Sequence, residues 1–92
     1  MVEKQVERRL IETVKQSGGM CLKLVGYRGI PDRLLLTEGG RVVFVEVKRP
    51  GCKLRPEQEA WQGKLRKMGF DAVTIDSYDA VDSLKMFLKG SK

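Results

Sequence analysis

The sequence predicts an α/β domain in which helices flank a mixed, largely four-stranded sheet, with the elements in the order αβββαβα. Apolar residues recur at helical spacing in some segments and alternate with polar residues in others, and glycines separate these segments. A strand-like segment also follows a helix that itself follows a strand, which is typical of a right-handed parallel crossover. We expect helices at 2–17, 56–68 and 78–88, and strands at 20–25, 32–37, 41–48 and 71–75.

The first predicted helix carries carboxylates on its apolar stripe. At about 100° per residue, Glu3 and Glu7 fall within the arc formed by the valines and leucine of this segment. A carboxylate on a core-facing stripe is costly unless it meets a partner or a metal. An acidic residue in the first turn can instead stabilise the positive end of the helix, which suits Glu3 better than Glu7.

The predicted strands 32–37 and 41–48 form a hairpin, because the glycines of Glu38-Gly39-Gly40 suit a tight turn. Side chains alternate between the faces of a strand, so Glu46 and Lys48 emerge side by side at the end of the second strand. Chain reversal can then bring Asp32, which follows Gly29-Ile30-Pro31, opposite this end.

Two carboxylates and a lysine in this arrangement can hold a divalent metal against a phosphodiester. Mg²⁺ takes oxygen ligands and is usually held by one or two carboxylates, here Asp32 and Glu46. The ion activates water near neutral pH and offsets charge on the phosphate oxygens. Lys48 can orient that water or stabilise the same charge. Charges at a strand end usually mark only a solvated face, so the combination of motifs carries the prediction.

The second predicted helix begins at Pro56, whose missing amide donor is tolerated in a first turn. Its apolar stripe is Trp61, Leu65 and Met68, and one turn earlier the same stripe reaches Gln58. Gln58 can therefore reach the strand that carries Glu46. It either satisfies a buried backbone group or positions water or phosphate.

The charge balance favours a polyanionic partner. Eighteen basic residues against 12 acidic ones give a net charge of +6, and the absence of histidine excludes His-based catalysis and His-ligated zinc. Phosphate contacts from such cations position a duplex without reading its sequence and weaken with salt. For Lys53 and Arg55, the alternative is a solvated charged loop with no DNA contact. The candidate DNA-binding cations near the two motifs are Lys23, Arg28, Arg33, Arg49, Lys53 and Arg55.

These segments together resemble the PD-(D/E)xK nuclease superfamily, and within it the small stand-alone virus-type replication-repair nuclease (VRR-NUC) domain of phages and bacteria. The resemblance runs from about Glu3 to Asp76. Any one of its segments is unspecific, but their order along the chain is fairly specific. The matching segments are Glu7 with Leu10-Ile11 and Gly18, Gly29-Ile30-Pro31-Asp32, Glu46-Val47-Lys48 and Pro56-Glu57-Gln58.

The resemblance implies a restriction-endonuclease-like core and a metal-dependent, structure-selective DNA endonuclease. Its substrate would be branched DNA, a four-way junction or a flap, in phage or prophage recombination and DNA repair, as for Holliday junction resolvases. Stand-alone members of this kind imply a homodimer. Mg²⁺ would be the cofactor, with Mn²⁺ able to substitute for it.

The resemblance also implies roles for individual residues. Asp32 and Glu46 would bind the metal, together with the backbone carbonyl of Val47. Lys48 would be the catalytic lysine and Gln58 an auxiliary glutamine. Glu7 would be the helix carboxylate that completes the metal site, with Glu3 as the fallback.

The 92 residues predict a single nuclease domain spanning 1–92. Cys21 and Cys52 are too few and too far apart for a zinc site or a disulfide framework. The sequence has no secretory signal and no apolar span of about 18 residues. We therefore expect a cytoplasmic protein with no membrane partner. The resemblance implies that it is phage- or prophage-encoded, acts in a bacterial host cell and uses no small-molecule cofactor.

Two other functions remain open. A sequence-specific, restriction-type endonuclease would use the same chemistry, although little chain is left over for base-reading elements. A non-catalytic nucleic-acid-binding module would suit the charge and small size. It would leave the combination of Glu7, Asp32, Glu46 and Lys48 unexplained.

Overall fold

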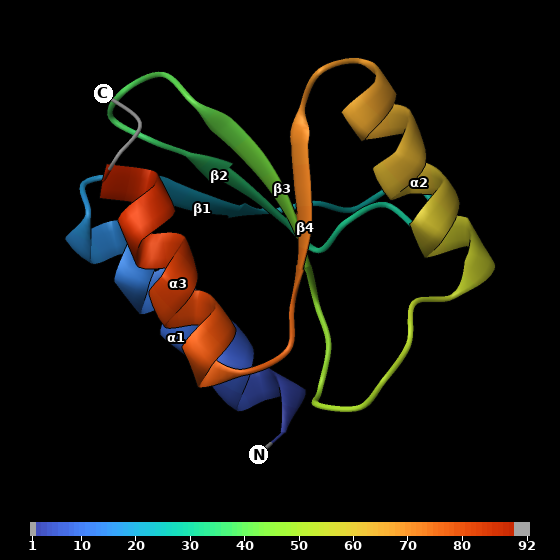
Figure 1. Ribbon diagram of the computed structural model, residues 1–92, viewed down its shortest axis with the longest axis horizontal. Coiled ribbons are helices and arrows are strands. Elements are labelled where there is room, and N and C mark those ends of the chain that lie inside the picture. The colour runs from blue at the N-terminus through green and yellow to red at the C-terminus, as the bar shows by residue number, and fades with distance from the viewer. Residues whose placement is uncertain (1, 90–92) are drawn as a thin grey trace.

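The computed structural model describes residues 2–89 and contains the predicted αβββαβα order (Figure 1). The bounds of the elements differ from the predicted ones by at most two residues. Met1 and residues 90–92, the ends of the predicted domain, lie outside the described part. The elements are α1 (Glu3–Gln16), β1 (Met20–Lys23), β2 (Arg33–Leu36), β3 (Val42–Val47), α2 (Pro56–Lys67), β4 (Asp71–Ile75) and α3 (Tyr78–Lys89).

The sheet is mixed and four-stranded in the described chain, in the order β1-β2-β3-β4. Strands β1, β2 and β3 pair antiparallel, and β4 pairs parallel to β3 after the crossover through α2. Helices α1 and α3 pack together on one face of the sheet, while α2 lies on the other side of β4 (Figure 1). The predicted fold class is confirmed, including the parallel crossover.

The core fills the space between the sheet and the α1–α3 pair. Strand β3 contributes Val43, Val45 and Val47 to it, all at most 2% exposed, as the predicted alternation of this strand requires. The opposite face of β3 carries Phe44, Glu46 and Lys48 by the same alternation. The other buried apolar residues of this cluster are Val6, Leu10, Val14, Leu35, Ile75, Val81, Leu84 and Leu88.

Helix α2 packs through a different face from the predicted stripe. Leu65 is buried as expected, but Met68 is 65% exposed, so that part of the prediction is wrong. Gln62 is buried instead and donates a hydrogen bond to Oγ1 of Thr74 at 2.8 Å. The Arg66 guanidinium donates to the carbonyl oxygen of Ala72. Polar contacts with β4 therefore set the rotation of α2, and apolar periodicity alone could not predict it.

Within residues 2–89, the helices are too short or too polar to cross a membrane.

Truncating the centre of the core tests this packing. We expect Leu10→Ala to lower the free energy of unfolding by about 2–5 kcal/mol, because Leu10 is fully buried and its removal leaves a cavity. Met20→Ala is the matched control, since Met20 is 57% exposed and should change the stability by about 0.5 kcal/mol or less. Urea unfolding measures both values, and equal losses would contradict the described core.

Candidate functional site

The ends of β2 and β3 bring Asp32 and Glu46 together. Arg33 pairs with Val45 in the antiparallel register, so the next pair along the strands is Asp32 with Glu46. Oδ2 of Asp32 accepts a hydrogen bond from the backbone amide of Val47 at 2.8 Å. This bond fixes the Asp32 carboxylate against β3 at the point where β2 begins.

Glu46 is 3% exposed, and its carboxylate is held from two sides. Nε2 of Gln58 donates to Oε2 of Glu46 at 3.1 Å, and the side chain of Asp32 shares a hydrogen bond with it. Burial, and then the charge and hydrogen bond of Asp32, raise the pKa of Glu46 to about 8, while the Lys48 ammonium opposes the rise. The two carboxyl groups therefore retain a proton near neutral pH when no cation compensates their charges.

Gln58 links this carboxylate to the start of α2. Its Oε1 accepts a hydrogen bond from the backbone amide of Arg55 at 2.8 Å while its Nε2 contacts Glu46. One end of the amide thus binds the backbone and the other binds the Glu46 carboxylate, while a role for Gln58 in positioning water or phosphate stays a prediction. Pro56 starts the helix immediately after Arg55.

The segment before Asp32 is fitted closely to α2. Gly29 has φ +83°, and a Cβ atom at this position would lie 2.8 Å from the backbone oxygen of Glu57. Pro31 is fully buried. A glycine is therefore required by both conformation and space, and the Gly-x-Pro-Asp motif delivers the carboxylate from a fixed loop.

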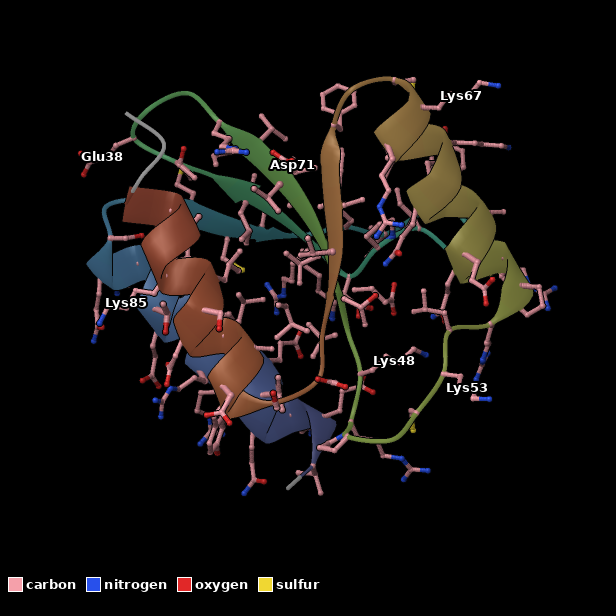
Figure 2. All side chains as sticks on the ribbon, viewed as in Figure 1. Glu38, Lys48, Lys53, Lys67, Asp71 and Lys85 are labelled. Atoms are coloured by element: carbon pink, nitrogen blue, oxygen red, sulfur yellow. The ribbon has the colours of Figure 1, made fainter. Side chains whose placement is uncertain are left out.

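Lys48 directly follows β3, and its backbone amide donates to the carbonyl oxygen of Ile75 at 2.9 Å. This bond continues the pairing between β3 and β4 by one residue. Its side chain points from the end of β3 toward the segment that leads to α2 and carries Lys53 (Figure 2). The ammonium is close enough to Glu46 to lower that group's pKa.

The two helix carboxylates have different surroundings. Oε2 of Glu7 accepts a hydrogen bond from Nε of Arg33 at 2.9 Å, in a pair whose side chains are 29% and 15% exposed. The charge of Glu3, one turn earlier, contributes to the raised pKa of Glu46. No three acidic, Cys or His side chains of the described residues are grouped closely enough to hold a metal together. The structure thus assembles Asp32, Glu46 and their neighbours, without a helix carboxylate in direct contact.

Sequence spacing did not predict the Glu7–Arg33 pair, although one signal for it exists. Arg33 shares the core-facing side of β2 with Leu35, so a cation and the Glu7 carboxylate both lie between sheet and helix. Opposite charges at such positions favour pairing with each other.

The predicted DNA-binding cations differ in how far they are committed to other contacts. Arg33 pairs with Glu7, the 89% exposed Arg28 pairs with Glu57 at 3.1 Å, and Nε of Arg49 donates to Sγ of Cys52 at 2.9 Å. The other three, which are exposed, are Lys23, Lys53 and Arg55. Their contacts with DNA stay predictions.

The raised pKa of Glu46 predicts a pH-dependent stability in the presence of a chelator. Between the ordinary value of 4.5 and about 8 the folded chain binds the extra proton, so stability should fall as pH rises through this window. Glu46→Gln removes the titrating group and should flatten the fall, leaving the variant more stable than the wild type at the alkaline end.

Thermal unfolding midpoints across this pH window measure the effect. Glu12→Gln, on the exposed side of α1, is the matched control and should follow the wild-type profile. Parallel profiles for the wild type and Glu46→Gln would contradict the assignment.

Comparisons with known proteins agree with this arrangement. The sequence model of the family described as "VRR-NUC domain" matches residues 2–79. The protein named "Putative nuclease p44" of Acyrthosiphon pisum secondary endosymbiont phage 1 is 38% identical over 79 residues, which cover 84% of this chain and 85% of that protein. A solved structure named "VRR_NUC domain" matches with a TM-score of 0.84 and 32% identity, covering 89% of this chain and 91% of that one. The chain therefore belongs to the VRR-NUC family of nucleases.

Proposed function

We propose that this nuclease is a Mg²⁺-dependent, structure-selective DNA endonuclease that hydrolyses phosphodiester bonds in branched DNA. Four-way junctions and flaps formed during phage or prophage recombination and repair, in the bacterial host cell, are its substrates. The observation that carries the proposal is the juxtaposition of Asp32 and Glu46 across β2 and β3, with Lys48 beside them.

The donor set fits a hard divalent cation. Two carboxylates held together away from water favour a compensating positive charge, and carboxylate oxygens are the ligands that Mg²⁺ and Mn²⁺ prefer. Asp32 and Glu46 would hold the ion, with the backbone carbonyl of Val47 as a further ligand. Once bound, the ion supplies activation of water and stabilisation of charge on the phosphate.

The neighbouring residues keep the carboxylates and the substrate in position. The Val47 amide orients the carboxylate of Asp32, and Gln58 orients that of Glu46. Hydrogen bonds of this kind restrict the side-chain conformations that a productive site needs. The Lys48 ammonium orients the attacking water or stabilises the charge that develops on the phosphate oxygens.

For the helix carboxylate, the contacts support Glu3 over Glu7. Glu7 is paired with Arg33, and withdrawing it would leave a largely buried guanidinium without its carboxylate. Glu3 lies in the first turn of α1, and its charge acts on Glu46. We assign the completion of the site to Glu3, while Glu7 anchors α1 to β2 through Arg33.

A homodimer would match the proposed substrate. The domain is small and carries a net charge of +6, which suits a polyanion but supplies one catalytic pair per chain. Two chains would offer two such pairs to the two strands of a branched DNA. The exposed cations around the site would then hold the phosphate backbone.

Removing one member of the site tests the proposed chemistry. We expect Asp32→Ala and Lys48→Ala each to lower kcat by about a hundredfold or more, because each removes a group that acts on the reacting phosphate. The assay uses labelled four-way junction, flap, single-stranded and duplex DNA with Mg²⁺, Mn²⁺ or chelator.

Lys85→Ala is the control, since Lys85 lies on α3, well apart from Lys48 (Figure 2). The proposal would be refuted if cleavage continues in chelator, or if Asp32→Ala and Lys48→Ala each still cleave as the wild type does. Cleavage at one short motif in linear duplex, indifferent to branches, would favour a restriction-type enzyme.

The two helix carboxylates are separated by their opposite effects on activity and stability. Glu3→Gln should lower kcat at least tenfold and lower the free energy of unfolding by less than about 1 kcal/mol, the contribution of a first-turn carboxylate to the helix N-terminus. Glu7→Gln should lower the free energy of unfolding by about 1–3 kcal/mol, because Arg33 loses a charged hydrogen-bond partner. Parallel cleavage and urea-unfolding measurements give both values. The reverse pattern would return Glu7 to the metal site.

A further inference from the structure

The loop between β1 and β2 presents an exposed aromatic ring that the site described above does not use. Tyr27 is 70% exposed and Val25 is 75% exposed, although both are large apolar residues. Arg28, the next residue, extends an 89% exposed side chain beside them. Exposed apolar groups gathered on one loop of a charged protein mark an interaction surface.

The ring is held in place by α2. Nε1 of Trp61 donates a hydrogen bond to the carbonyl oxygen of Arg28 at 3.0 Å, and the Tyr27 and Trp61 rings lie 5.9 Å apart at 57°. The amide of Ile30 donates to the carbonyl oxygen of Tyr27 at 3.2 Å, which closes a turn. Tyr27 is therefore a fixed aromatic side chain with one side against Trp61 and most of its surface open to solvent.

The same helix connects this loop to the catalytic pair. Glu57 pairs with Arg28, and its backbone packs against Gly29. Gln58, the next residue, donates to Glu46. Only two residues, Ile30 and Pro31, lie between Gly29 and Asp32. The exposed ring thus belongs to the surroundings of the site and is not a remote patch.

We infer that Tyr27 is a stacking platform for an unpaired nucleobase of the DNA, an inference that rests on the proposed nuclease function and names the substrate feature it selects. Every base has a π-face on which an aromatic ring can stack, whatever the sequence. In an intact duplex these faces are covered by neighbouring base pairs. Away from the ends of a duplex, a base is open to the ring only where a strand leaves the stack, as at a branch point.

Charge supports a nucleic acid over a protein at this surface. Arg28 lies in the loop next to Tyr27, the exposed Lys23 ends the strand before the loop, and the chain has a net charge of +6. A second copy would bring the same positive charges to this surface and be repelled, whereas phosphates would be attracted. The phosphates next to an unpaired base can therefore contact these cations while the base stacks on Tyr27.

Binding measured in chelator tests this inference without any cleavage. The wild type and the Tyr27→Phe and Tyr27→Leu variants are titrated against a flap carrying 2-aminopurine at the unpaired position, and against a blunt duplex of the same length. We expect Tyr27→Leu to weaken flap binding by between about fivefold and 150-fold, the factor that corresponds to one stacked base. Tyr27→Phe keeps the ring and should retain the wild-type affinity and the quenching of 2-aminopurine.

The outcomes separate this inference from the proposed function. Unchanged flap binding by Tyr27→Leu, or an equal loss on flap and duplex, would overturn the stacking role even if the wild type cleaves branched DNA with Mg²⁺. Loss confined to the flap would support it even if no cleavage is seen. If sedimentation shows that Tyr27→Leu has a different oligomeric state from the wild type while its DNA affinity is unchanged, the ring belongs to a protein interface and the inference is overturned.

Discussion

The close approach of two carboxylates, Asp32 and Glu46, is the constraint around which this end of the molecule is organised. Like charges held close together repel each other, and burial disfavours the ionised form of Glu46. Two hydrogen-bond donors and a cation offset this repulsion and loss of hydration: the Val47 amide, the Gln58 amide and the Lys48 ammonium. The compensation therefore comes from two segments, the end of β3 and the start of α2.

Strand β3 lets one short segment serve both stability and chemistry. One face is fully committed to the apolar core through Val43, Val45 and Val47. The other face carries Glu46, so the same packing holds its backbone, and Gln58 and Asp32 hold its carboxylate. A buried carboxylate on a central strand is thus positioned by the packing of residues on the opposite face of that strand.

Local patterns predicted what depends on the backbone alone. Period-two alternation and the glycine turn place Asp32 opposite Glu46, and the order of elements gives the parallel crossover, as the structure has them. The rotation of α2 could not be read from the sequence, because it depends on Thr74 and Ala72, which lie on a later strand. The environment of Glu7 escaped prediction for the same reason, since Arg33 reaches it only after α1 packs on β2.

The two glycines of the β1–β2 loop divide it into parts with different freedom to change. Gly26, at φ +107°, has open space where a side chain would be, whereas a side chain at Gly29 would meet the backbone of Glu57. A side chain at Gly26 would strain the backbone but meet no neighbour, so its cost would stay local to the loop. At Gly29 the added atom would also press on α2, so the cost would reach the loop that delivers Asp32.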